Sequence, residues 1–236
     1  LGWCGLNFDE GPHLKGDFGP YRQSERKKLY KLYVDKLLES GSAYYAFDTE
    51  KELDEMRSNL KQAGVQSPQY NYITRQNMKN SLTLPVEEVN KKLTNNEAHV
   101  VRIKMPRNQT IKFEDKIRGW VAFNTNHLDD KVLYKSDGMP TYHLANVIDD
   151  YLMKISHVIR GEEWLPSAPL HVFLYECLGW EGEMPEFAHL PLILNPEGNG
   201  KLSKRDGDRL GFPIFPTLWE NSKNNVVIEG YKEKGF

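Results

Sequence analysis

The chain has 236 residues, of which 39% are hydrophobic and 27% charged, a composition typical of a globular protein with one large domain or two modest ones. Its formal net charge of -2 means that a nucleic-acid partner would need a local basic face. The two cysteines, Cys4 and Cys177, lie far apart without a Cys-x-x-Cys spacing, which argues against a disulfide framework and against zinc. No apolar run approaches the about 18 residues of a membrane span, and no signal peptide is evident, so we expect a cytoplasmic chain without a membrane partner.

The N-terminal part is predicted to be helical. Apolar residues recur at helical spacing through residues 20–40, and Gly41 follows as a stop signal. A second helix is predicted to begin at Thr49, because Glu52 stands three residues later, the spacing of a capping box, and to end at Gly64. Both are expected to be surface helices with one buried stripe.

The middle of the chain has the alternation of strands. Apolar and basic residues alternate over 101–105, a turn sequence occupies 106–108, and 110–113 alternates again, which predicts an antiparallel pair. Another short strand is predicted at 132–134. Residues 44–135 therefore form a predicted α+β insertion, distinct from the C-terminal part of the chain.

From residue 142 onward the predicted elements alternate between helix and strand. The helices are expected at 142–150 and at 168–178, and the strands at 156–159 and 190–194. This order predicts an α/β fold with a parallel sheet. Ligands bind beyond the carboxyl ends of such strands, so the loops that follow the two strands should emerge at the same edge.

The loop after the last predicted strand has the residues to hold a polyphosphate. Lys201 and Lys204 are three residues apart with Ser203 between them, after a turn-forming run at 196–200. The loop is not a Walker A motif, because Leu202 follows the first lysine where Ser or Thr is required. Taken alone, it is more simply a solvated charged loop.

Further motifs place this loop in a specific family. Gly138 to Asn146 reads GMPTYHLAN, His157 to Trp164 reads HVIRGEEW, and Lys201 to Arg205 reads KLSKR. In this order and spacing they resemble the second half of the catalytic domain of glutamyl-tRNA synthetases, which are class I aminoacyl-tRNA synthetases. Leu6–Pro12, Tyr21–Arg26 and Gly41–Phe47 also resemble that family, so the match covers nearly the whole chain.

The resemblance implies part of a Rossmann-like parallel-sheet catalytic domain with an inserted α+β acceptor-stem-binding domain. Residues 1–43 and 136–236 would belong to the catalytic domain, and 44–135 would bind the tRNA acceptor stem. The implied activity is ATP-dependent attachment of glutamate to tRNA(Glu) through a glutamyl-adenylate, with Mg²⁺ entering as MgATP, no zinc, and a monomeric protein.

The resemblance also implies roles for particular residues. Those expected to bind ATP are Lys201, Ser203, Lys204, Leu192, Ile193 and Trp164. Those expected to bind glutamate are Tyr142, Asn146, Arg160 and Glu163. Lys204, assisted by Lys201, would be catalytic by neutralising charge on the separating phosphates.

Each assignment has a simpler structural alternative. The guanidinium of Arg160 suits a carboxylate ligand, but an ion pair with Glu162 or Glu163 would also satisfy it. Tyr142 and Asn146 share a helical face and could instead pack or cap the helix. Trp164 could fill the core, and the apolar positions 192 and 193 suit any buried strand.

The local positive charge of the middle segment is a second candidate for RNA contact. Its basic residues are Lys91, Lys92, Arg102, Lys104, Arg107 and Lys112. They would clamp phosphates of the acceptor stem, or they form an ordinary solvated surface.

One departure from the family keeps other functions open. A His-Ile-Gly-His-type motif is absent, because all seven histidines stand alone. The chain is therefore interpreted as an internal segment of a longer enzyme, without that motif or an anticodon-binding region, and by itself inactive in aminoacylation. The alternatives are a glutaminyl-tRNA synthetase, a relative that glutamylates a tRNA base, and a noncatalytic RNA-binding module derived from a synthetase.

Overall fold

The computed structural model describes residues 7–14, 16–196, 200–203 and 206. The chain divides into two compact units, Leu1–Leu190 and Pro191–Phe236, and each is described by itself. Lys204 lies outside the described residues. In the described part of the chain, none of the helices combines the length and hydrophobicity that a membrane-spanning segment needs.

The described part of the first unit contains both helices and strands, which alternate regularly only from Tyr142 onward. The α-helices are α1 (Lys27–Glu39), α2 (Glu50–Gln62), α3 (Val86–Thr94), α4 (Tyr142–Leu152) and α5 (Ala168–Leu178). The strands are β1 (Ala43–Ala46), β2 (Val100–Ile103), β3 (Thr110–Asp115), β4 (Gly119–Asn124), β5 (Val132–Tyr134), β6 (His157–Gly161) and β7 (Glu186–Leu190). Short 3-10 turns occur at η2 (Gln23–Glu25), η3 (Thr74–Asn77), η4 (Thr125–His127), η5 (Glu162–Ser167) and η6 (Glu181–Glu183).

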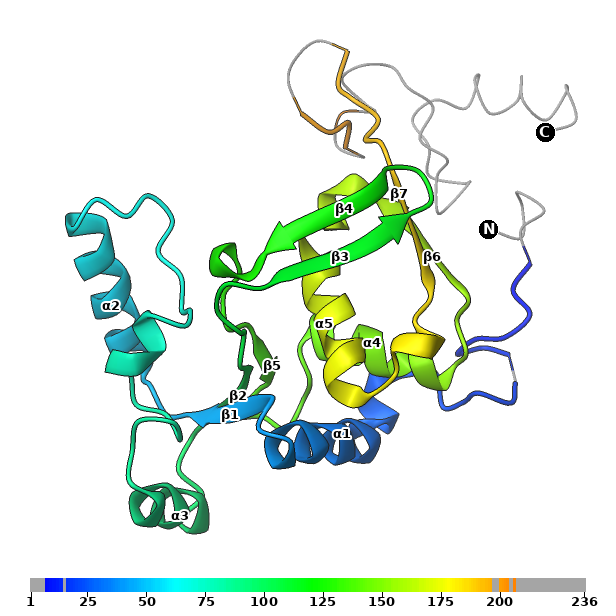
Figure 1. The fold of residues 1–236 in the computed structure, drawn as a ribbon. Coiled ribbons are helices and arrows are strands. Elements are labelled where there is room, and N and C mark those ends of the chain that lie inside the picture. The colour runs from blue at the N-terminus through cyan, green and yellow to red at the C-terminus, as the bar shows by residue number, and fades with distance from the viewer. Residues whose placement is uncertain (1–6, 15, 197–199, 204–205, 207–236) are drawn as a thin grey trace, which may run out of the picture. The chain divides into compact units, whose positions relative to one another are not determined.

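The strands form two separate sheets (Figure 1). One has the order β1-β2-β5 and is antiparallel. The other has the order β4-β3-β7-β6, in which β4 is antiparallel to β3, whereas β3, β7 and β6 are parallel. The parallel strands β6 and β7 are linked through η5 and α5, so the mixed α/β fold with a parallel sheet is confirmed.

Local signals in the sequence explain several element ends. Thr49 and Glu52 form the expected capping box at the start of α2, each accepting from the backbone N–H of the other. Gly179 ends α5 with φ 73°, a left-handed conformation that glycine adopts at low cost. The helix predicted over 20–40 is shorter than expected, because the regular part begins only at Lys27. The stripe predicted for α2 is only partly buried: Leu53 and Met56 pack against a small core cluster, but no residue of that helix is fully buried.

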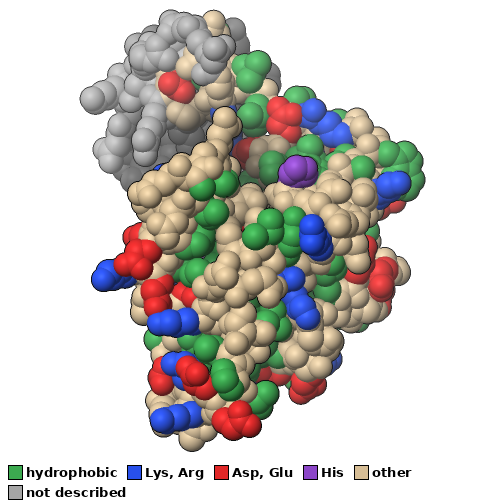
Figure 2. Space-filling view, turned by 60° about the vertical axis from the view of Figure 1, so that its left-hand side comes forward, with side chains coloured by type: hydrophobic (Ala, Val, Ile, Leu, Met, Phe, Trp, Pro, Cys, Tyr) green, Lys and Arg blue, Asp and Glu red, His purple; other side chains and the backbone are tan. Residues whose placement is uncertain are grey.

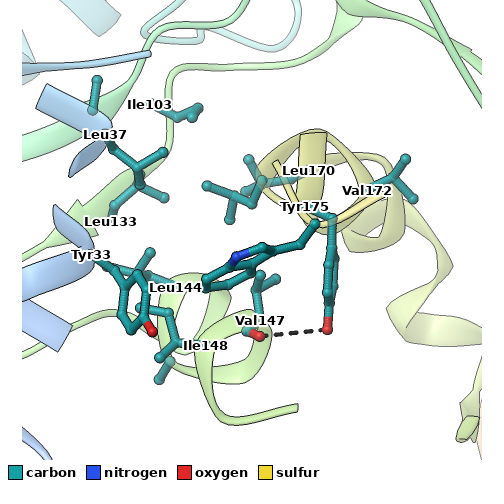
Figure 3. Packing of buried hydrophobic residues seen from close by; sticks show 14 of the residues in the cluster. Tyr33, Leu37, Ile103, Leu133, Leu144, Val147, Ile148, Leu170, Val172 and Tyr175 are labelled. Atoms are coloured by element: carbon teal, nitrogen blue, oxygen red, sulfur yellow. Dashed lines mark hydrogen bonds between the residues drawn. The ribbon is translucent and has the colours of Figure 1, made fainter. Parts of the chain in front are cut away.

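The main hydrophobic core lies between α1, α4 and α5 and both sheets. Figure 3 shows Tyr33 and Leu37 of α1 facing side chains of α4 and α5, with Leu133 of β5 close by. The hydroxyl of Tyr175 donates to the carbonyl of Val147, so the buried phenol also ties α5 to α4. The core thus fixes both helices, and α4 and α5 carry residues of the candidate site.

A buried ion pair joins the start of α1 to α4. Arg26, which is 2% exposed, donates from Nε to Asp149 Oδ1 at 2.8 Å, and Tyr30 donates to the same carboxylate. Burial raises the pKa of Asp149, and the hydrogen bonds from Tyr30 and Arg26 oppose that rise. Asp149 therefore has a structural role.

The predicted pairing of 101–105 with 110–113 is wrong. β2 pairs with β1 and β5, whereas β3 pairs with β4 and with β7. Alternation shows that a segment is a half-buried strand, but it does not select the partner, and here both strands find partners elsewhere.

The predicted strand at 190–194 is also wrong, because β7 occupies Glu186–Leu190. Pro191 has no N–H to continue the ladder, and beyond it Ile193 is 74% exposed. The strand is hidden in the sequence because its buried positions include His189.

Candidate functional site

Arg160 lies near the carboxyl end of β6, where its guanidinium is held from two sides. Its Nε donates to Nε2 of His189 at 3.0 Å, and its Nη1 donates to the hydroxyl of Tyr142 at 3.1 Å. The guanidinium carbon also lies 5.8 Å from the centre of the Phe187 ring. The remaining nitrogen, Nη2, is buried and has no hydrogen-bond partner within the part of the chain that the structure describes.

His189 is itself held by a carboxylate. Its Nδ1 lies 2.6 Å from Oδ2 of Asp115, and both side chains are 0% exposed. Burial alone would raise the pKa of Asp115, but hydrogen bonds from His189 and from backbone N–H groups outweigh it and lower that pKa. A buried anion therefore stands behind the imidazole that supports Arg160.

Tyr142 and Trp164 form an aromatic wall next to Arg160. Their ring centres are 4.8 Å apart, and each residue is 41% exposed. Both also line a cavity of ≈ 540 Å³ that reaches to Phe123 and Lys131. That Tyr142 binds glutamate and Trp164 binds ATP stays a prediction, but the structure does place the two rings side by side.

Asn146 lies one turn after Tyr142 on α4, and its side chain is hydrogen-bonded to a neighbouring residue. It hydrogen-bonds Asp150, and burial together with the nearby charge of Asp149 raises the pKa of Asp150 to about 6. The positive charge of Arg160 acts in the opposite direction on Asp150. A half-buried carboxyl that titrates near neutral pH thus lies within the field of Arg160.

Two histidines behind Tyr142 form a neutral pair. Nδ1 of His143 and Nε2 of His171 are 3.2 Å apart. Burial lowers the pKa of both, and for His171 the positive charge of Arg160 lowers it further. The pair therefore adds no positive charge to the site near pH 7.

The two glutamates that follow β6 are placed differently. Glu162 forms an ion pair with Arg118. The carboxylate of Glu163 folds back over Gly161, at a place where a Cβ on residue 161 would overlap it. The site beside Arg160 is thus bordered by acidic side chains at the start of η5.

The loop that contains Lys201 and Lys204, called the lysine loop, belongs to the second unit. Leu194 and Lys201 form an antiparallel bridge, and Leu202 N–H donates to the carbonyl of Ile193 at 2.8 Å. The hydroxyl of Ser203 donates to Asp206 at 2.9 Å. The described residues on the two sides of the loop are therefore paired antiparallel, and Lys201 is exposed.

The basic residues of the middle segment do not all reach solvent. Arg102 is 8% exposed, donates to the carbonyl of Asp130, and stacks on Tyr70 at 4.0 Å, so it is structural and the prediction of a phosphate contact is wrong. Lys92 pairs with Glu88 and Glu97. The exposed members of the set are Lys91, Lys104, Arg107 and Lys112. On the face shown in Figure 2, Lys and Arg alternate with Asp and Glu instead of gathering in one patch.

Comparison with known proteins identifies the family. The model of the family described as tRNA synthetases class I (E and Q), catalytic domain, matches residues 1–221. The chain belongs to this family. The resemblance inferred from its motifs is thereby confirmed, and the described sheet is part of a Rossmann-like catalytic domain.

Relatives of this synthetase chain carry one name. It is 60% identical over 236 residues to the glutamate–tRNA ligase of Amoebophilus asiaticus and 57% identical to that of Cytophaga hutchinsonii, and it covers 46% of each. A crystal structure of a glutamate tRNA ligase from Elizabethkingia meningosepticum, in complex with its amino acid, superposes with a TM-score of 0.86 at 56% identity, over 92% of this chain and 42% of that one. The chain thus spans less than half the length of these relatives.

Sequence reasoning missed the residues that hold the guanidinium of Arg160 in this synthetase chain. Asp115 and His189 are 74 positions apart, and only the pairing of β3 with β7 brings them together. The one available signal was a histidine inside an apolar segment, which usually indicates a satisfied core histidine.

The raised pKa of Asp150 generates a prediction about stability. Because its pKa is about 6 in the folded chain and lower in the unfolded one, Asp150 imposes no penalty below about pH 4. Stability is lost as the pH rises through 6, where the buried group ionises. We expect Asp150→Asn to be more stabilising at pH 7 than at pH 4 by on the order of 2 kcal/mol, measured by urea unfolding across that range. Equal pH dependence in the two proteins would contradict it.

Proposed function

We propose that this chain supplies the glutamate site and part of the ATP site of a glutamate–tRNA ligase. One observation carries the proposal: the guanidinium of Arg160 presents a buried Nη2 without a partner among the described residues. A guanidinium in this state suits a carboxylate, which can accept a charge-assisted hydrogen bond from Nη2 and neutralise the charge. The names of the relatives agree with this choice of ligand.

The charge of Arg160 also favours glutamate over glutamine. The side-chain carboxylate of glutamate gains a charge-assisted hydrogen bond and neutralises the guanidinium, whereas the neutral amide of glutamine leaves the buried positive charge uncompensated. The hydroxyl of Tyr142 already accepts from Nη1 and can donate its own proton to the same ligand. Asn146 and Glu163 are proposed to contact the amino acid as well, since they lie on the adjoining turns of α4 and η5.

The reaction proposed for the longer protein has two steps. The glutamate carboxylate attacks the α-phosphate of ATP, pyrophosphate leaves, and the terminal ribose hydroxyl of tRNA(Glu) then takes the glutamyl group from the adenylate. Lys201 and Lys204 would neutralise the phosphates, with Mg²⁺ arriving on ATP. Ser203, Leu192, Ile193 and Trp164 are proposed to complete the nucleotide contacts. A monomeric, cytoplasmic enzyme is part of the same proposal.

The proposed division into domains rests on the same family resemblance. Residues 1–43 and 136–236 would form the catalytic domain and 44–135 the acceptor-stem-binding insertion. β3 and β4 lie within 44–135, yet β3 pairs with β7. The insertion would therefore be joined to the catalytic sheet through the backbone hydrogen bonds between β3 and β7.

Two substitutions in the longer protein should separate binding from chemistry. We expect Arg160→Ala to raise the glutamate KM about 100-fold, because a paired charge is lost, while Lys204→Ala lowers kcat about 100-fold, because the leaving phosphates lose a cation. Glutamate-dependent ATP–pyrophosphate exchange with tRNA present measures both. Arg57→Ala is the control, since Arg57 contacts only Asp54 among the ion pairs of α2 described here. Normal exchange by the Lys204 variant would contradict the assignment, and no exchange by the parent protein would favour the noncatalytic module.

The exposed basic residues should contribute a salt-dependent term to RNA binding. If Lys104 and Arg107 contact acceptor-stem phosphates, the double variant Lys104→Ala, Arg107→Ala should flatten the slope of log K against log salt by about 2. Titrating a short acceptor-stem duplex at several salt concentrations measures the slope. Lys28→Ala, on the exposed face of α1, should leave it unchanged. An unchanged slope in the double variant would identify these residues as ordinary solvated surface.

The 236-residue chain by itself is expected not to aminoacylate tRNA, because a complete nucleotide site is proposed to need the family's histidine motif. Aminoacylation of tRNA(Glu) with labelled glutamate measures this directly, with the longer protein as the positive control. Glutamyl-tRNA formed by the isolated chain would contradict the expectation.

A further inference from the structure

The hydrogen bonds around Arg160 form a series in which every donor points toward Asp115 or Tyr142. Asp115 accepts from Nδ1 of His189, and Nε2 of His189 accepts from Nε of Arg160. Arg160 in turn donates to Tyr142. This series of hydrogen bonds begins at the junction of β3 with β7 and ends at the surface, where the carboxyl end of β6 meets the start of α4.

Only one tautomer of His189 satisfies both of its ring hydrogen bonds, to Asp115 and from Arg160. The Asp115 carboxylate can only accept, so the proton of the neutral imidazole must be on Nδ1. The guanidinium of Arg160 can only donate, so Nε2 must present a lone pair. The imidazole is therefore an adaptor that converts a buried anion into a correctly placed acceptor for a cation.

We propose that Asp115 and His189 are positioning residues of the glutamate site. By fixing this tautomer, they aim Nη2 of Arg160, which has no hydrogen-bond partner among the described residues, at the substrate carboxylate. The inference rests on the proposed function, because it concerns how the same site reaches its affinity for glutamate. With Nε and Nη1 both engaged, the plane of the guanidinium is fixed, and Nη2 is the nitrogen without a partner in the part of the chain that the structure describes. Binding then does not require the side chain to be reoriented.

The backbone next to Asp115 prevents its carboxylate from turning. Oδ1 accepts from the backbone N–H groups of Ile117 and Arg118, each at 3.0 Å, while Oδ2 faces the ring of His189 and accepts from its backbone N–H at 3.2 Å. In Asp115→Asn the amide oxygen is therefore favoured at the Oδ1 position, because an NH₂ group there would face more backbone donors than at the Oδ2 position. The amide nitrogen then occupies the position of Oδ2, opposite Nδ1.

This nearly isosteric change should switch His189 to its other tautomer. With a donor opposite Nδ1, the proton of His189 moves to Nε2 and points at the Nε–H of Arg160. Two donors then face each other, and Arg160 leaves its orientation. We expect the glutamate KM of the longer protein to rise about tenfold, the effect of losing one charge-assisted hydrogen bond, with the ATP KM and the kcat at saturating glutamate within about twofold of the parent.

The experiment is ATP–pyrophosphate exchange with tRNA present, combined with ¹⁵N NMR of the His189 ring. The inference predicts an Nδ1–H tautomer in the parent and an Nε2–H tautomer in Asp115→Asn. An unchanged glutamate KM, or an unchanged tautomer, would overturn it. If the parent protein shows no glutamate-dependent exchange, the proposed function fails and the inference falls with it, whereas normal parental exchange with an unaffected Asp115 variant defeats the inference alone.

Two substitutions of His189 distinguish positioning from simple structural support. His189→Gln places an amide oxygen near Nε2 and keeps an acceptor for Arg160, but it loses the donor to Asp115. His189→Asn keeps a donor near Nδ1 for Asp115 and loses the acceptor for Arg160. Positioning predicts that Gln restores a glutamate KM close to the parent's and that Asn does not. A purely structural role predicts that Gln is at least as harmful, because it leaves the buried Asp115 without its side-chain donor.

Asp130→Asn is the matched control. Asp130 is also wholly buried and accepts from Tyr44, Arg75 and the backbone of Met105, but its hydrogen bonds do not lead to Arg160. We expect it to lower the melting temperature while the glutamate KM stays within about twofold of the parent's. A similar rise in KM for Asp130→Asn and Asp115→Asn would mean that general destabilisation explains both, and it would overturn the inference.

Discussion

The carboxylate of Asp115 is the constraint on which the described site depends. It closes β3, accepts from the backbone of the turn that leads to β4, and accepts from both the backbone and the ring of His189 on β7. One anion thus joins the antiparallel hairpin to the parallel part of the sheet. Its burial costs solvation energy, and the four N–H groups offset that cost while fixing the strand register at this point.

The position of Arg160 follows from that register. β6 and β7 pair so that Arg160 lies opposite His189, and α4 brings Tyr142 to the other side of the guanidinium. The helix is in turn held by the core and by the pair of Arg26 with Asp149. A cation at the carboxyl end of a parallel strand is where α/β proteins commonly bind anionic ligands, so the architecture and the proposed chemistry agree.

The sequence predicted local structure well wherever a local signal determined it. The capping box at Thr49, the glycine end of α5 and the strand at 132–134 are all present. The failures came from pairing: alternation at 101–105 could not show that its partners were β1 and β5, and the apolar run after Leu190 concealed that the strand lies before it. Strand partners are chosen by the whole sheet, and a window of neighbouring residues does not contain that information.

For the site, the sequence by itself determined which residue types were available: an arginine after a strand, a tyrosine and an asparagine one turn apart, and a lysine loop. The motifs of the sequence also determined the family. The tertiary structure alone decided how Arg160 is held. Asp115 and His189 become neighbours only when β3 lies beside β7, and Arg102 becomes structural only when it is buried over Tyr70. The physical reason is that the role of a charged group depends on its solvation and its partners, and both are properties of the folded chain.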